Sequence, residues 1–500
     1  MAHKKKNNNI AKAILMDDTE LEYVITDNPP RGGMKYTYFT PDKKYAVQFF
    51  NKAEDAESAQ MQARLENIVG LYNPTISQDE GGAMGNTSET AAYFSRLFCW
   101  PVALIKEPEF GVVCPTYPQN FFFGKDAVKP GVNLDMDGKD KKSKWFTSRS
   151  SRWLAEKEKG NFQTMLRLSI SLARAIRRMH AAGLSHSDLS SNNVLIDPKT
   201  GSCVVIDIDS LVVPGVFPPE VAGTKGYIAP EVLETMEFDF DDPKRKLPCA
   251  ATDLFALPVL LYEYLLHRHP LDGPKVYSTV STEEDEYLQY GPKATFIENP
   301  QDTSNRPDDL EVTIHDLGPY LEKLFLQAFV DGLHDPDKRP TASQWERALG
   351  KTWDLLQPCK NPHCRAQWFV LYDLHNPVCP YCGQGLDSRD VMHLRLKKPM
   401  RGRKGQWQQV GEINLYDRMP LFNWHFIANV YPDEKMQNRS MQAYISHQGS
   451  EWYLVNNALA GMLSPKGNLV PVGQAVWLKD GEIFPSSNNP EALLLEVVRG

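Results

Sequence analysis

Three polar residues in one stretch of the chain have side chains that could take part in phosphate chemistry. Asp188 and Asn193 lie five residues apart, and Asp207 follows fourteen residues after Asn193. Carboxylate and amide oxygens are the hard ligands that Mg²⁺ prefers, and phosphoryl transfer needs neutralised phosphate oxygens and an oriented acceptor hydroxyl. Because turns also favour Asp and Asn, each residue alone indicates little. Their order, with the run Tyr227–Glu231 after them, favours a phosphoryl-transfer site.

A second group of residues with chemical potential is a cysteine cluster near residue 370. Cys359 and Cys364 form C-x4-C, and Cys379 and Cys382 form C-x2-C, with fourteen residues between the two pairs. Thiolates at these gaps can converge on one tetrahedral zinc ion, which predicts a structural Zn²⁺ site with all four positions filled. His363 is an alternative ligand. Without zinc we expect about thirty residues to unfold, while the rest of the chain stays folded if the interface is small.

The elements that must position these residues follow from hydrophobic periodicity. Alternating β-formers predict strands, and helices are predicted by a run without Gly or Pro, by apolar residues at helical spacing, or by a long apolar run. The expected strands are 21–26, 35–39, 45–50, 98–105 and 110–114, and the expected helices are 53–69, 162–180 and 254–266. Residues 124–158 are rich in Gly, Lys and Asp with few aliphatic side chains, so they predict a mobile insertion. Short strands return after about residue 395, which gives an α+β chain.

Composition excludes several classes of function. The chain has 500 residues, 42% hydrophobic residues and a net charge of −8. This acidity, without a basic aromatic stripe, disfavours a nucleic-acid partner. The most apolar stretch, Leu254–Leu266, is too short to span a bilayer and contains Glu263. With no secretory signal at the N-terminus, we expect a soluble cytoplasmic protein of roughly two to four domains.

The polar residues stand in motifs that resemble those of eukaryotic-type protein kinases. The catalytic loop, the metal-binding loop and the end of the activation segment correspond to His186–Asn193, Asp207–Asp209 and Gly223–Glu231. The resemblance implies a two-lobed, ATP- and Mg²⁺-dependent Ser/Thr protein kinase. Asp188 would be the base, and Asn193 and Asp207 would hold magnesium, with Asp209 as the alternative to Asp207. A pseudokinase scaffold that binds nucleotide weakly is the other interpretation.

The residues that correspond to the nucleotide-binding part of the kinase pattern depart from it. The resemblance assigns nucleotide contacts to Gly32, Gly33, Lys35, Gln48, Glu66, Thr116 and Tyr117. Gln48 stands where the third strand normally carries a lysine, and an amide cannot neutralise phosphate. Lys35, on the strand before, resembles the displaced lysine of with-no-lysine kinases and would replace it; an exposed lysine at a strand end is the alternative. The carboxylate partner of Lys35 on the following helix would be Glu66 or Glu57.

Further residues of the kinase-like motifs bear on regulation by phosphorylation and on the stability of the fold. Ser187 replaces the arginine that receives an activation-loop phosphate, Ser190 replaces a phosphate-contacting lysine, and the segment 211–223 has no Ser, Thr or Tyr. We therefore expect no phosphorylation switch there. The resemblance implies that Asp253 is structural and that Arg339 pairs with Glu231. Thr224 holds the position associated with Ser/Thr specificity.

The whole layout resembles the bacterial eukaryotic-like (Hanks-type) kinases of tellurite-resistance-type triads. The resemblance implies a protein substrate, with a von Willebrand A-domain protein as a candidate, and a counteracting phosphatase as partners. The C-terminal strands are similar to a forkhead-associated β-sandwich. The expected parts are an N-terminal tail, two kinase lobes, a zinc ribbon and this sandwich, at 1–19, 20–118, 119–350, 355–390 and 395–500.

Overall fold

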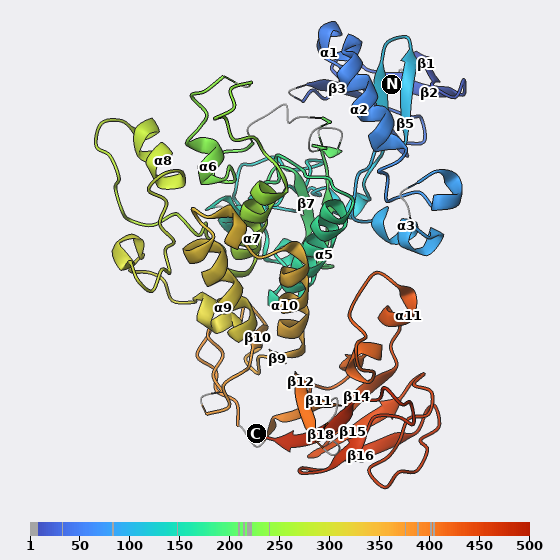
Figure 1. Cartoon of the computed structure of the whole chain (residues 1–500), viewed down its shortest axis with the longest axis vertical. Helices are drawn as coiled ribbons and strands as arrows, with labels where there is room; N and C mark the ends of the chain where they lie inside the picture. The colour runs from blue at the N-terminus through green and yellow to red at the C-terminus, as the bar shows by residue number, and fades with distance from the viewer. Residues whose placement is uncertain are drawn as a thin grey trace.

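The computed structural model has a barrel-containing lobe, a helical lobe, a cysteine-rich hairpin and a pair of C-terminal sheets, in that order along the chain (Figure 1). It describes residues 9–32, 34–82, 85–147, 149–208, 211–213, 216–217, 223–239, 241–375, 377–387, 390–400, 403 and 406–500. Helices and strands are both abundant, as the α+β expectation requires.

Six strands of the first lobe close into a barrel in the order β1-β2-β3-β4-β6-β5. Their bounds are Asn9–Leu15, Glu20–Ile25, Lys35–Phe39 and Tyr45–Phe50 for β1 to β4, and Ala103–Glu107 and Gly111–Pro115 for β5 and β6. The short helix α1 (Ala53–Glu57) and the helix α2 (Ala59–Val69) follow β4, and α3 (Ser88–Phe94) precedes β5. The rings of Tyr23, Tyr38 and Phe49 pack on one another in the barrel core.

Three expectations for this lobe need correction. The tail expected over residues 1–19 contains β1, which pairs antiparallel with β2 and places Ala13 in the barrel core with no exposed surface. The small side chain of Ala13 packs in one cluster with Tyr23 and Phe49. The single helix expected over 53–69 is divided at Ser58, whose hydroxyl caps α2. The strand expected from residue 98 begins at Ala103.

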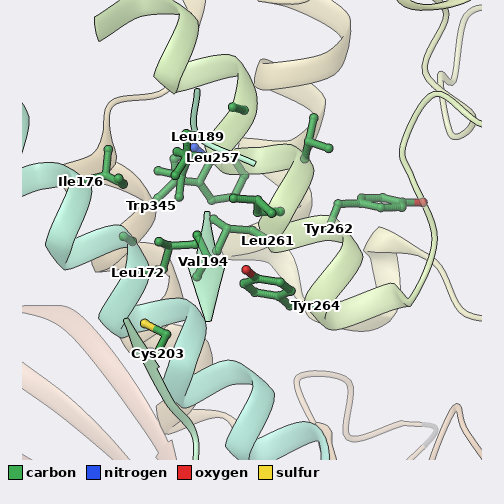
Figure 2. Packing of buried hydrophobic residues seen from close by; sticks show 14 of the residues in the cluster. Leu172, Ile176, Leu189, Val194, Cys203, Leu257, Leu261, Tyr262, Tyr264 and Trp345 are labelled. Atoms are coloured by element: carbon green, nitrogen blue, oxygen red, sulfur yellow. The ribbon is translucent and has the colours of Figure 1, made fainter. Parts of the chain in front are cut away.

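The second lobe is mainly helical and has one large core. Its principal elements are α5 (Phe162–Ala181), β7 (Val194–Asp197), β8 (Ser202–Val205), α6 (Pro230–Leu233), α7 (Ala250–Leu266), α8 (Thr282–Tyr290), α9 (Pro319–Leu326), a π-helical turn (Gln327–Asp331) and α10 (Ala342–Asp354). Leu172 of α5, Leu257 of α7 and Trp345 of α10 meet in the core (Figure 2). Among the described residues, no helix is both long and apolar enough to cross a membrane.

The segment 119–161 connects the two lobes and is packed, which corrects the mobile insertion expected over 124–158. Met136, Phe146 and Leu154 are almost fully buried in the main core. Lys141 is 3% exposed, and its ammonium lies 3.0 Å from Glu158 and 3.7 Å from Asp197. The segment also contains the short helix α4 (Lys144–Thr147). Few aliphatic residues suffice here because the segment lies against the large helical core.

The cysteine cluster lies beside a two-stranded hairpin of β9 (Leu356–Pro358) and β10 (Trp368–Val370). Cys359 and Cys364 lie in the loop between these strands, and Cys379 and Cys382 follow β10. The hairpin packs against the start of α5, where the rings of Phe162 and Tyr381 are 5.7 Å apart and the backbone N–H of Phe162 donates to Ala366. The Tyr372 hydroxyl lies 2.7 Å from His315 Nε2. The cysteine-rich region therefore contacts the helical lobe through both aromatic packing and hydrogen bonds.

The C-terminal region consists of two four-stranded antiparallel sheets with one shared core. The first has the order β12-β11-β18-β17 and the second β13-β14-β15-β16. Their bounds are Met392–Pro399 (β11), Trp407–Asn414 (β12), Pro420–Leu421 (β13), Ala443–Gln448 (β14), Glu451–Asn456 (β15), Ala475–Leu478 (β16), Ile483–Pro485 (β17) and Leu494–Arg499 (β18). The likeness to a forkhead-associated domain stays a prediction.

The C-terminal sheets are joined to the helical lobe by polar contacts. Asn414 donates to the carbonyl oxygens of Leu355 and Leu371. Arg177 of α5 pairs with Glu346 of α10 and also with Glu434, which precedes the short helix α11 (Met436–Arg439). In Figure 1, α11 lies on the side of the sheets that faces the helical lobe.

Candidate active site

A cleft of about 770 Å³ lies between the barrel and the helical lobe. It brings together predicted site residues that are far apart in the sequence. Those on its wall are Gly32, Lys35, Gln48, Thr116, Tyr117, Asp188, Asn193 and Asp207. Gly33 and the alternative ligand Asp209 lie outside the described residues, as does most of the segment 211–223.

The catalytic-loop residues are held in place by short hydrogen bonds. The Asn193 amide donates to the backbone oxygen of Asp188 at 2.8 Å and to its Oδ2 at 2.9 Å. The other carboxylate oxygen, Oδ1, accepts from the Thr224 hydroxyl at 2.7 Å. Ser187 and Asp207 have positive φ angles of 65° and 63°, an uncommon conformation that marks tightly determined backbone. Asp188 is thus fixed with its carboxylate at the cleft.

Asp253 at the start of α7 supports this loop from below. Its Oδ2 accepts from the backbone N–H of His186 at 2.8 Å and lies 3.0 Å from His180 Nε2 of α5. The side chain is 1% exposed. The ring of His186 in turn reaches the carbonyl of Ile206, next to Asp207, at 2.9 Å. One buried carboxylate therefore links the catalytic loop to two core helices, and the structural role expected for Asp253 is confirmed.

The pairing of Arg339 with Glu231 is also confirmed. The guanidinium donates from Nη1 and Nη2 to the two carboxylate oxygens at 2.8 and 2.7 Å, a bidentate geometry. It also donates to the backbone oxygens of Gly332 and Ala251. The end of the activation segment is thereby fastened to the base of the lobe.

A buried carboxylate lies beneath the same segment. The Tyr227 hydroxyl donates to Glu263 Oε2 of α7 at 2.6 Å. Burial raises the pKa of Glu263 to about 8, and it also raises the pKa of Tyr227. Because ionising a carboxyl group in the core is unfavourable, Glu263 holds its proton at neutral pH and Tyr227 stays neutral. The contact is a hydrogen bond between neutral groups.

Lys35 and Gln48 lie on the cleft side of adjacent strands. Side chains alternate along β3, so Lys35 and Thr37 border the cleft while Tyr36 packs in the barrel. The Gln48 amide donates to Thr37 Oγ1 at 3.3 Å. The Lys35 ammonium lies 5.6 Å from the centre of the Phe50 ring. The pKa of the buried Cys114 thiol is lowered, first by the Cys99 thiol and then by Lys35. All three residues line the cleft.

The carboxylate partner expected on the following helix is not found in the cleft, and this corrects the assignment of Glu66. Both Glu66 and Glu57 are exposed. The buried face of α2 consists of Met61, Arg64, Leu65 and Ile68, with Met61 at the cleft. The helical period directs these residues inward and Glu66 away. Arg64 is 2% exposed, and its guanidinium carbon lies 5.8 Å from the Phe217 ring.

Several cleft residues were missed by the sequence analysis. Phe122, Asp140 and Lys142 of the segment 119–161 line the wall. The rings of Tyr117 and Phe122 stack with centres 4.9 Å apart. This segment was interpreted as mobile, and no motif marks it, so only the three-dimensional structure places it at the site.

The four cysteines converge as expected. Their sulfur atoms all lie within 4.8 Å of one another, with Cys359 and Cys382 3.6 Å apart and Cys364 and Cys379 3.8 Å apart. A tetrahedral zinc site with Zn–S bonds of about 2.3 Å has S···S edges of about 3.8 Å. Among the described residues, His363 is not part of this group. The donor set and its spacing fit a four-coordinate metal ion.

Comparison with known proteins agrees with the catalytic geometry. Residues 147–351 match the protein kinase domain. The chain is 31% identical over 166 residues to the human anti-Muellerian hormone type-2 receptor, covering 28% of this chain and 27% of that protein. It is 26% identical over 199 residues to the Saccharomyces cerevisiae serine/threonine-protein kinase RAD53, covering 38% of this chain and 21% of that protein.

Mouse protein kinase C eta type is 28% identical to the chain over 163 residues, covering 32% of this chain and 20% of that protein. The chain thus spans only about a quarter of the length of the relatives it matches. The family model describes a protein kinase domain, and the relatives include a serine/threonine-protein kinase and a protein kinase C. The chain therefore contains a protein kinase domain with serine/threonine kinase homologues.

Proposed function

We propose that this chain is an ATP- and Mg²⁺-dependent protein kinase that phosphorylates Ser or Thr of a protein substrate. The observation that carries the proposal is the fixed position of Asp188, bonded by Asn193 and Thr224 at the floor of a cleft that Lys35 and Asp207 share. A carboxylate held there can orient an acceptor hydroxyl and take its proton, which contributes about 10²–10⁴-fold to such reactions.

The negative charge of the ATP phosphates must also be neutralised. Asn193 and Asp207 would hold Mg²⁺ through oxygen atoms, and the bound ion would supply neutralisation of the β- and γ-phosphates. Lys35 of β3 supplies a positive charge, because its flexible side chain lets the ammonium reach into the cleft next to Gln48. Gln48 can donate a hydrogen bond but adds no charge. Asp188 therefore works beside a relocated lysine.

The test is transfer of label from γ-labelled ATP to casein or to the chain itself, with wild type, Asp188→Asn, Lys35→Met and Lys12→Met. Lys12 lies exposed on β1, paired with Glu20, and serves as the matched control. We expect wild type and Lys12→Met to be equally active and the other two variants to lose transfer. Activity of Lys35→Met equal to wild type would contradict the relocated lysine. Nucleotide binding by wild type without transfer would support a pseudokinase scaffold instead.

The proposal includes a structural Zn²⁺ in the four-cysteine group. We expect purified wild-type chain to contain about one zinc per chain by elemental analysis, and Cys379→Ser to contain much less. Cys249→Ser is the control, because Cys249 lies at the N-terminus of α7, where Ser is a good cap. Since the hairpin packs on α5, metal loss should also lower the melting temperature of the helical lobe. Wild type without bound metal would contradict this part.

A protein substrate, with a von Willebrand A-domain protein as a candidate, and a counteracting phosphatase are also part of the proposal. They rest on the resemblance in layout alone. Mixing the chain, ATP and a purified von Willebrand A-domain protein, followed by phosphosite mapping, tests them. Phosphate on Ser or Thr of the added protein is expected, and its absence from an otherwise active kinase contradicts that candidate.

A further inference from the structure

The cleft wall carries three cationic side chains in the part of the chain that the structure describes. They are Arg31, Lys35 and Lys142. Arg31 is exposed, and its guanidinium lies over the Tyr36 ring at 5.3 Å. Lys142 differs from the other two because it comes from the segment 119–161, on the same side of the cleft as the catalytic loop. It therefore needs an explanation of its own.

Backbone pairing fixes the position of Lys142 beside the catalytic loop. Lys142 forms an antiparallel bridge with Leu195 of β7, two residues after Asn193. On either side, the Ser143 N–H donates to the carbonyl of Val194, and the Ile196 N–H donates to the carbonyl of Lys141, both at 2.9 Å. The residue is thus attached to the strand that continues from the magnesium-binding Asn193.

Alternation along this extended piece directs Lys142 into the cleft. Lys141 and Ser143 are 3% and 0% exposed, so both face the core. Successive side chains of an extended segment point to opposite sides, and Lys142, between them, is half-buried and borders the cleft. Its stem is covered while its ammonium can reach the cavity, as long charged side chains commonly do.

The charge of Lys142 is not compensated by an acid in the described residues. The neighbouring Lys141 is paired with Glu158 and Asp197, whereas no carboxylate lies within ion-pair distance of Lys142 in the described ranges. Asp140, two residues earlier, acts on Tyr117 instead. There, burial first and then the Asp140 carboxylate raise the pKa of the Tyr117 hydroxyl. A half-buried cation with no acidic partner at a cavity indicates an anionic ligand.

We propose that Lys142 is a second cation of the nucleotide triphosphate site, supplied by the segment 119–161. The inference rests on the proposed function, because ATP is the anion assigned to this cleft. It also accounts for a deficit of charge: Gln48 and Ser190 are neutral where phosphate-contacting lysines are expected from the kinase pattern. Lys142 compensates for Ser190 from a strand that pairs with the end of the same loop.

The test compares binding of adenosine, ADP and ATP, each with Mg²⁺, by calorimetry. The variants are Lys142→Met, Lys142→Arg and Lys139→Met, in the full chain. Lys139 lies three residues earlier, is exposed and does not line the cleft, so it is the matched control. We expect Lys142→Met to weaken ATP binding about tenfold, ADP less, and adenosine not at all. Lys142→Arg should restore most of the ATP affinity, and Lys139→Met should match wild type.

Several outcomes would overturn the inference. An equal loss for adenosine and ATP would show that Lys142 only supports the fold of the cleft. Unchanged ATP affinity with a raised KM for the protein acceptor would assign Lys142 to an acidic side chain of the substrate. Wild type that binds no Mg²⁺-nucleotide would contradict the proposed function as well, which distinguishes that failure from failure of Lys142 alone.

Discussion

The catalytic-loop side of the cleft comprises Asp188, its partners Asn193 and Thr224, and Asp253, which accepts from the backbone N–H of His186 in the same loop. Each is held by at least one hydrogen bond between protein groups. The phosphate side comprises Lys35, Gln48 and Lys142, single side chains from three separate segments. Gln48 bonds to Thr37 at 3.3 Å, whereas the two lysines reach the cleft on flexible stems. One side is a hydrogen-bonded network around one loop, and the other combines two lysines and a neutral amide from three separate segments.

Proton abstraction and phosphate neutralisation differ in how much displacement of the participating side chains they tolerate. A base must lie within hydrogen-bond distance of one hydroxyl, so a small displacement of Asp188 costs much of the rate. Neutralising a triphosphate requires charge within reach of several oxygen atoms, and lysine stems can supply it from more than one backbone position. The catalytic-loop side should therefore be sensitive to any substitution that removes one of its hydrogen bonds, whereas a lysine on the phosphate side should be movable.

The largest effect is expected from Asp188→Asn. Loss of the base should lower kcat by about 10²–10⁴-fold, with little change in the affinity for Mg²⁺-ATP or in the melting temperature. Asp253→Asn gives the contrast, because its carboxylate supports the loop and touches no substrate. That variant should lower both kcat and the melting temperature. If both variants lower only kcat, the distinction between base and support is wrong.

A pH-dependent stability is expected on the catalytic-loop side, from Glu263 beneath Tyr227. Its folded-state pKa of about 8 lies above the usual 4.5, so the stabilisation is complete below the unfolded-state value and is lost as pH rises towards 8. The loss is on the order of 5 kcal/mol. Glu263→Gln keeps the acceptor for Tyr227 and should flatten the melting temperature between pH 5 and 8. If wild type and Glu263→Gln show the same slope of melting temperature against pH, Glu263 is not the cause of the pH dependence.

On the phosphate side, Lys35→Met should lower kcat/KM by about 100-fold. A second substitution, Gln48→Lys, should then recover most of the loss. The two positions are diagonal neighbours, because Thr37 lies opposite Gln48 and Lys35 is two residues away on the same face. Steady-state kinetics of the single and double variants measure the recovery. Gln48→Leu in the same background is the control, and recovery by Leu would show that charge is not the cause.

Residues in short motifs could be predicted from the sequence, whereas residues whose burial depends on the rest of the fold could not. Asp188, Asn193, Asp207, Glu231 and Arg339 were recognised because short motifs fix their types and spacing. The barrel strand β1 and the packed segment 119–161 were missed. In both cases burial depends on surfaces made by residues far away in the chain, so Ala13 and Met136 carry no local pattern. Glu66 was misassigned because spacing from a strand does not determine which face of α2 is buried.

The smallest effect is expected from Thr224→Val, which removes the hydroxyl that donates to Asp188 Oδ1 at 2.7 Å. Thr and Val have the same shape, so the substitution tests that hydrogen bond. A net contribution of about 1 kcal/mol corresponds to a fall in kcat of roughly fivefold. Thr224→Ser keeps the hydroxyl and should retain nearly full activity. If Ser and Val lower kcat equally, the methyl group positions the loop, and the catalytic-loop side depends on packing there as much as on its hydrogen bonds.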